Sequence, residues 1–200
     1  MNNLTFQEDG HIYRLNGVEI PSVTEILKEA GLSDMSKIPA SVLERALNFG
    51  KAVHKAIELS SKGSLCHDSL DPLLLPYLNG WKAFVEDFGY VCQKYEYRHH
   101  HGTYRYGLTI DQAGIITKGK YQGATLGDIK TGQPYPSHKF QLAGYKLAIG
   151  KHYNTFILYL NPDFKPRGYK VVFATNNKRE QGVFLAALTL YNVRKEEKLI

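Results

Sequence analysis

"GDIKTGQPYPSHKFQLAGYKLA", residues 127–148, reads as a strand that is joined to a helix by a loop rich in glycine and proline. Side chains two apart in a strand share a face, so Asp128 and Lys130 point the same way. Side chains four apart in a helix also share a face, which puts Gln141 beside Tyr145. The stretch therefore predicts a strand followed by a helix. Its polar groups either form a solvated face or converge on one site.

The segments before this stretch predict a small hairpin and several helices. Turn pairs at Asp9-Gly10 and Asn16-Gly17 indicate short N-terminal strands. Ser22 and Glu25 form a capping box that begins a helix, which Gly31 ends. A longer helix is expected from about 41 to 60, and a further one is expected to be broken or kinked near Pro76 and Gly80.

Strand periodicity replaces helical periodicity after residue 90. The expected strands are "YVCQKYEYR", "YRYGLTID" ending at Asp111, and "ATLGDIK", followed by the helix already described, the strands "TFILYL" and "YKVVFA", and a helix beginning near Asn176. This order predicts one α/β domain over residues 1–200, with helices packed around one sheet. Its parts are an N-terminal hairpin and helices (1–90), a sheet and helix (90–150), and C-terminal strands and a helix (151–200).

Composition excludes several classes of protein. The net charge of +6 raises the prior for a polyanionic partner, and 43% hydrophobic residues are typical of a globular chain. The two cysteines are far apart and no C-x-x-C pair occurs, which excludes a cysteine-built zinc or iron–sulfur site. No phosphate-cradling G-x-x-x-x-G-K-[ST], no G-x-S-x-G and no H-E-x-x-H motif is present. With no signal peptide or long apolar run in the sequence, a cytoplasmic protein with no membrane contact is expected.

Two carboxylates at neighbouring strand ends would offer hard oxygen ligands. If the strand ending at Asp111 pairs with the strand that carries Asp128, these side chains meet near the backbone carbonyl of Ile129. Mg²⁺ and Mn²⁺ prefer such oxygens, and they polarise phosphoryl oxygens. A lysine beside such an ion, here Lys130, could stabilise negative charge in a transition state.

Five segments in order resemble the PD-(D/E)XK nuclease superfamily, within it the RecB-like and phage-type exonuclease branch. They are "PSVTEIL" (21–27), "GKAVHKAIE" (50–58), "TID" (109–111), "DIKTG" (128–132) and "QLAGY" (141–145). The resemblance implies a restriction-endonuclease-like core, which is a central mixed β-sheet flanked by helices. It also implies a Mg²⁺- or Mn²⁺-dependent deoxyribonuclease, a phage- or prophage-type exonuclease of DNA recombination or repair.

The same resemblance assigns roles to individual residues. Asp111, Asp128 and Lys130 would be catalytic, and the metal ligands would be His54, Asp111, Asp128 and the Ile129 carbonyl. Gly50, Gln141 and Tyr145 would border the substrate. Glu58 shares a helix face with His54 and is either an additional ligand through water or part of a solvated face. The family often has Glu where this chain has Asp128, and often has Gly where it has Leu108.

Other features leave alternatives open. The tract "RHHHG" (98–102) favours an exposed edge or loop over a metal site. Tyr104 and Tyr106 could stack on unpaired bases, although exposed loop residues explain them equally well. The partner implied is DNA, with a single-strand annealing or single-strand-binding protein and a homo-oligomer as further possibilities. The rival function is a non-catalytic DNA-binding or adaptor protein that keeps the fold.

Overall fold

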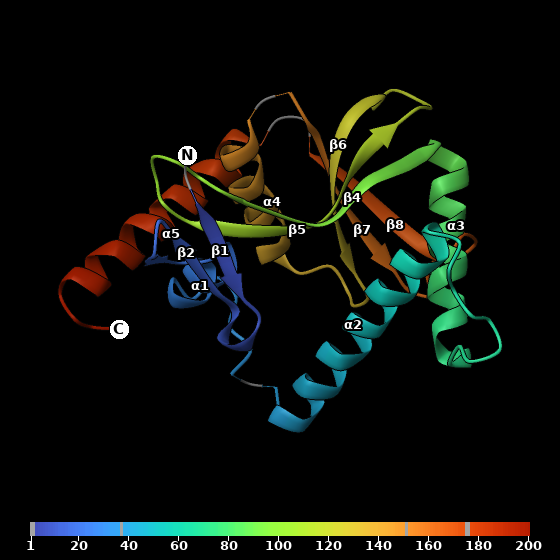
Figure 1. Ribbon diagram of the computed structural model, residues 1–200, viewed down its shortest axis with the longest axis horizontal. Helices are drawn as coiled ribbons and strands as arrows, with labels where there is room; N and C mark the ends of the chain where they lie inside the picture. The colour runs from blue at the N-terminus through green and yellow to red at the C-terminus, as the bar shows by residue number, and fades with distance from the viewer. Residues whose placement is uncertain (1–2, 37, 151, 175–176) are drawn as a thin grey trace.

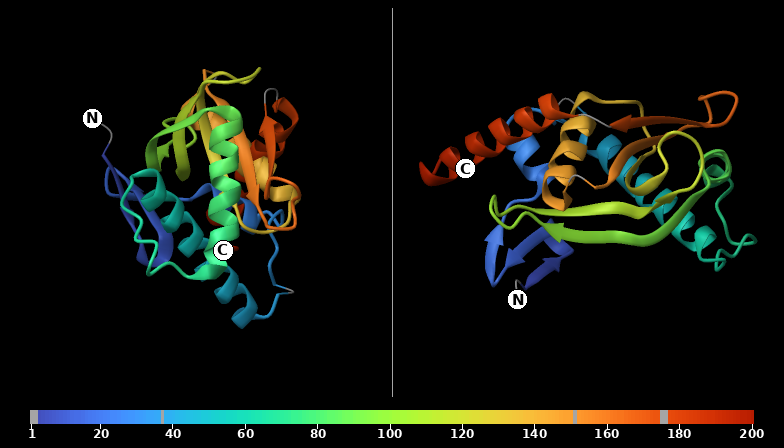
Figure 2. Two further views of the ribbon diagram at one scale, coloured as in Figure 1. Left: turned by 90° about the vertical axis from the view of Figure 1, so that its right-hand side faces the viewer. Right: turned by 90° about the horizontal axis from the view of Figure 1, so that it is seen from above.

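The computed structural model describes residues 3–36, 38–150, 152–174 and 177–200. Its centre is a five-stranded sheet in the order β4-β5-β6-β7-β8, with helices on both faces (Figures 1 and 2). Only β6 and β7 pair in parallel, so the sheet is mixed. The predicted α/β fold class, with a central mixed β-sheet flanked by helices, is confirmed.

A separate three-stranded sheet forms at the N-terminus from β1 (Leu4–Gln7), β2 (Ile12–Leu15) and β3 (Val18–Ile20). Asn16 and Gly17 both have left-handed φ values, 54° and 81°, as the predicted two-residue hairpin requires. A 3₁₀ turn, η1 (Asp9–His11), joins β1 to β2. This small sheet therefore follows the turn signals in the sequence.

Helices α1 (Val23–Glu29) and α2 (Ala40–Ser61) follow. The capping box is present, because Ser22 Oγ accepts from Glu25 N at 3.0 Å and Glu25 Oε2 accepts from Ser22 N at 3.2 Å. Helix α2 keeps Gly50 in its interior, as expected. In Figure 1 its N-terminal half extends away from the sheet.

The kink expected near Pro76 and Gly80 is wrong. After η2 (Pro72–Leu74), α3 runs unbroken from Leu75 to Phe88. Pro76 lies in its first turn, where a missing N–H costs nothing. Gly80 faces a close neighbour instead: a Cβ there would lie 2.6 Å from the Gly168 carbonyl oxygen. Glycine at this position therefore permits close packing and does not bend the helix.

Three antiparallel strands form one half of the sheet: β4 (Tyr90–His100), β5 (Gly107–Ile116) and β6 (Gly123–Lys130). The expected end of the second strand at Asp111 is wrong, because β5 continues for five more residues. The apolar segment "AGII" that follows Asp111 pairs with β6, and this pairing extends the strand beyond Asp111. Asp111 therefore lies in the middle of its strand.

The chain then crosses through α4 (Pro136–Ile149) to β7 (Asn154–Leu160), returns in β8 (Tyr169–Ala174) and ends in α5 (Lys178–Glu196). The predicted start of the last helix, near residue 176, lies outside the described residues. Apolar side chains of α1, α4 and α5 pack on one face of the sheet, and those of α2 and α3 pack on the other. None of the described helices has the length and apolarity needed to span a membrane.

Candidate functional site

The site lies where β5 and β6 separate. Their pairing stops at Gln112 with Gly127, just before Asp111 and Asp128. The carboxylate of Asp111 enters the gap, where its Oδ2 accepts a hydrogen bond from Ile129 N at 2.6 Å. One oxygen of Asp111 is thereby fixed by the backbone, and the other is directed towards α2.

Three potential metal ligands meet at that second oxygen. One ligand atom each of His54, Glu96 and Asp111 lies within 4.8 Å of the others. His54 Nδ1 is 3.7 Å from Asp111 Oδ1. Burial and the charge of Asp111 raise the pKa of Glu96, although much of that residue is exposed. Two carboxylates this close repel each other unless a cation lies between them.

The imidazole of His54 is oriented by the backbone. Its Nε2 lies 3.1 Å from the carbonyl oxygen of Ile129. Because a carbonyl only accepts, Nε2 carries a proton, which leaves Nδ1, the nitrogen that faces Asp111, as the atom that can bind a metal. Metal-ligating histidines commonly use their second nitrogen in this way.

Asp128 and Lys130 form a pair on the α4 side of the site. Asp128 is 2% exposed, and its Oδ2 lies 2.8 Å from Lys130 Nζ. Among the described residues this buried oxygen has no hydrogen bond of good geometry. Burial raises the pKa of Asp128 to about 6 against the opposing charge of Lys130, and Asp111 raises it further. Burial acts to lower the pKa of Lys130, but the two carboxylates outweigh it and raise that pKa.

Gln141 and Tyr145 lie in the wall of the same cavity as Asp128. Both are buried, and Gln141 Nε2 donates to the Tyr145 hydroxyl at 2.6 Å. Gly50 differs from expectation in one respect: a Cβ there would meet only Thr131 Oγ1, at 3.6 Å, which is ordinary contact. Close packing of its helix therefore does not require glycine at that position.

Glu58 lines the site but is held by two lysines. Its carboxylate lies 2.9 Å from Lys55 Nζ and 2.5 Å from Lys62 Nζ. Hydrogen bonds from Lys62 and Lys55 lower its pKa. Glu58 is therefore an engaged surface carboxylate at the border of the site, and it is not among the three grouped ligands.

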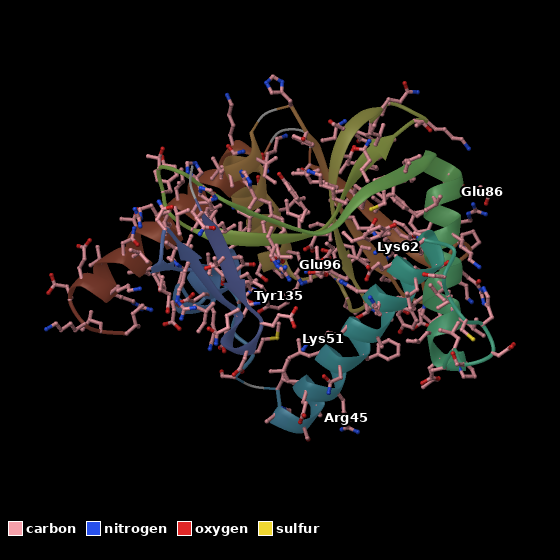
Figure 3. All side chains as sticks on the ribbon, in the orientation of Figure 1. Arg45, Lys51, Lys62, Glu86, Glu96 and Tyr135 are labelled. Carbon is pink, nitrogen blue, oxygen red and sulfur yellow. The ribbon has the colours of Figure 1, made fainter. Side chains whose placement is uncertain are left out.

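Two cavities adjoin at the acids. The smaller, about 260 Å³, includes His54, Glu58, Glu96, Asp111 and Ile129 in its lining. The larger, about 770 Å³, reaches from Asp128, Lys130, Gln141 and Tyr145 to the N-terminal sheet. Glu96, Asp111 and Lys51 line both. Figure 3 labels Lys51 on α2 and Glu96 above it.

Two other predicted features lie away from this site. His99 and His100 are on β4, an edge strand, and the tract adds no second group of three potential ligands among the residues described. Tyr106 cannot stack on a base, because it is fully buried and its hydroxyl donates to the Gly144 carbonyl at 2.8 Å. Tyr104 is 45% exposed and contacts His101. The stacking interpretation of Tyr106 is therefore wrong.

Sequence reasoning missed Glu96. The register of β4 on β5, with Tyr95 opposite Gln112 and Tyr97 opposite Ile110, brings it level with Asp111. A register shift between Cys92 and Lys94 precedes it, and its φ is +47°. An irregular strand with an unusual backbone is a functional signal in a structure, but nothing in the letters "KYEYR" reveals it.

Comparison with solved structures gives partial superpositions. Two structures of LHK-Exo, an alkaline exonuclease from Laribacter hongkongensis, superpose with TM-scores of 0.41 and 0.39 at 15% identity. The first, in complex with dAMP, covers 90% of this chain and 95% of the exonuclease; the second covers 90% and 94%. SSO0001 superposes at 0.32 over 73% of this chain and 70% of its own, also at 15% identity. No family model and no curated protein matches the sequence.

Proposed function

We propose that this chain is a divalent-metal-dependent deoxyribonuclease that hydrolyses DNA phosphodiester bonds, and specifically a phage- or prophage-type exonuclease of recombination or repair. The observation that carries the proposal is the meeting of His54, Glu96 and Asp111 within 4.8 Å, beside the buried pair of Asp128 and Lys130. A folded chain has little reason to gather these carboxylates unless a cation joins them.

The donor set suits a hard cation such as Mg²⁺ or Mn²⁺. Two carboxylates and an imidazole nitrogen would hold it. Asp128, whose Oδ2 pairs with Lys130, and the Ile129 carbonyl, which His54 contacts, come from the neighbouring strand β6. Such an ion polarises a phosphoryl oxygen and lowers the pKa of a bound water. Sharing of one ion by Asp111 and Asp128 remains a prediction.

The protein's own groups have separate tasks. The backbone N–H of Ile129 fixes Asp111, and the Ile129 carbonyl fixes His54, so both are oriented before substrate binds. Lys130 stays protonated, because Asp128 and Asp111 raise its pKa, and it can stabilise the charge that develops on the attacked phosphate. Gln141 and Tyr145 hold the wall beside it.

The charge in the larger cavity argues against the rival function, a non-catalytic DNA binder. Six acids line the cavity (Glu8, Glu25, Glu29, Glu96, Asp111 and Asp128), against the four bases Lys28, Lys51, Arg98 and Lys130. A surface selected only to hold phosphates would have the opposite excess. We propose DNA as the substrate. An annealing protein, a single-strand-binding protein, a homo-oligomer and a cytoplasmic location remain predictions.

End-labelled linear DNA and closed circular DNA, incubated with Mg²⁺ or Mn²⁺, test the proposal. We expect degradation of the linear form only, its loss in EDTA, and its loss in Asp111→Asn. Glu58→Gln is the matched control, because it removes a carboxylate of the same cavity that two lysines already engage. Absence of degradation with either metal would refute the enzyme. Equal degradation of circular DNA would refute only the exonuclease assignment.

A further inference from the structure

The N-terminal sheet contributes an aromatic wall to the larger cavity. Phe6, His11 and Tyr13 are among the residues that line it. Their rings form one cluster, with centroids 4.9 Å apart for Phe6 and His11, 4.7 Å for Phe6 and Tyr13, and 5.3 Å for His11 and Tyr13. The guanidinium of Arg98, on β4, covers the Phe6 ring at 4.5 Å from its centroid.

One side of the aromatic cluster is buried and hydrogen-bonded, and the other side is exposed to solvent. Tyr13 is 1% exposed, and its hydroxyl shares a 2.5 Å hydrogen bond with Thr109 Oγ1, two residues before Asp111. Its ring lies over Gly107, where a Cβ would be 2.4 Å away. His11 is exposed, and Arg98 keeps 43% of its side chain in solvent. The two outer members therefore present planar groups to the cavity on a fixed base.

His11 has an unfavourable backbone conformation. Its φ of +53° lies in the left-handed region that residues with a side chain rarely adopt. That conformation sets the ring against Phe6 and Tyr13. Burial and the nearby Arg98 lower the pKa of His11, so the ring is neutral at neutral pH. Unusual backbone of this kind is concentrated at binding sites.

The charge of the cavity determines which part of DNA such a wall can bind. With more acids than bases in the lining, phosphate attraction contributes little away from the metal ligands. Planar groups bind the faces of bases, and those faces are accessible only in an unpaired strand. Stacking can therefore supply affinity in this cavity that electrostatics does not.

We propose that His11 and Arg98, backed by Phe6 and Tyr13, form a platform on which a base of an unpaired DNA strand stacks as that strand enters the site. This inference rests on the proposed function and specifies its substrate: a single strand or a frayed end. The planar guanidinium of Arg98 has one face on the Phe6 ring. Its contact with Glu8 is long, at 3.8 Å, and leaves the other face available for a base.

A protein–DNA mutant cycle in Ca²⁺ tests the platform. Fluorescence anisotropy measures binding of a short single-stranded oligonucleotide in which one position at a time is made abasic, and a gel after each titration verifies that the strand is intact. At one position we expect base removal to weaken binding to the wild-type protein by about 5- to 150-fold, which is the range for one stacked base. The same removal should change binding to Arg98→Lys or His11→Asn by less than about twofold. Arg98→Lys keeps the charge but loses the plane, and asparagine tolerates a left-handed backbone.

Tyr104→Ala is the matched control, because it removes an exposed aromatic outside the cavity and should leave the cycle unchanged. Phe6→Leu keeps apolar volume under Arg98. An effect of this variant is therefore due to loss of the aromatic ring and not to loss of the N-terminal sheet. If no abasic position distinguishes the wild-type protein from the variants, the platform is refuted. These results do not depend on cleavage, so a failed nuclease assay and a failed platform are distinguishable.

Discussion

Replacing Glu96 by glutamine should strengthen the metal-free fold and weaken metal binding. Glu96 and Asp111 have carboxylate oxygens within 4.8 Å. At an effective dielectric of about 20, their repulsion is about 3 kcal/mol. Because Glu96 is exposed to solvent, screening leaves about 1 to 2 kcal/mol as the expected gain of Glu96→Gln in EDTA. For a chain of this length the gain corresponds to a melting temperature higher by roughly 2–8 °C.

The metal-bound state should respond in the opposite direction. At Mn²⁺ one hundredfold above its dissociation constant, the wild-type protein gains about 2.7 kcal/mol, or roughly 5–11 °C. Loss of one ligand that weakens binding at least about tenfold halves this gain or reduces it further. Differential scanning fluorimetry of both proteins in EDTA and across a Mn²⁺ titration measures both effects, with Glu58→Gln as the control. An unchanged Mn²⁺ shift in Glu96→Gln, or a lower melting temperature in EDTA, would refute the shared site.

Three further predictions follow from single contacts. Lys130→Met should lower the cleavage rate by about 10²–10³ while keeping the Mn²⁺ thermal shift, and Lys130→Arg should not restore the rate; near-native cleavage would remove Lys130 from the mechanism. Burial raises the pKa of Asp128 to about 6. In EDTA its contribution to stability should therefore be lost as the pH rises through 6 and recovered towards pH 4. Thermal melts of Asp128→Asn should lack this pH-dependent change in stability. Gly107→Ala should cost about 1–3 kcal/mol in urea unfolding, because its Cβ would meet the Tyr13 ring, whereas Gly182→Ala, in open space on α5, should be neutral or stabilising; an equal effect of both would contradict the packing described.

Local signals in the sequence predicted local structure well. The Ser22 capping box, the turn at Asn16-Gly17 and the strand–helix pair around Asp128 and Gln141 all occur as expected. Each of these depends on residues within a few positions of one another, which is the range over which sequence patterns act. The strand that carries Asp111 was misjudged at its end, because pairing with β6 extends it.

Features that depend on tertiary contact were not predictable. The need for glycine at position 80 comes from the close approach of Gly168. The burial of Tyr106 comes from its contact with α4. Neither partner is near in sequence. Glu96 reaches the site because of the register of β4 on β5, and that register could not be predicted from this sequence alone. The position of Arg98 over the Phe6 ring likewise depends on how the N-terminal sheet lies against β4.

On the proposed function, the distribution of charge predicts two kinds of DNA affinity in this chain. The whole protein carries +6, yet acids outnumber bases in the larger cavity. The excess positive charge therefore lies outside it, where it can attract duplex or single strand without regard to sequence and will lose strength as salt rises. Inside the cavity, the two proposals assign the affinity to a divalent cation at His54, Glu96 and Asp111 and to stacking at His11 and Arg98. Salt should consequently weaken capture of DNA much more than it weakens occupancy of the cavity once a strand is in place.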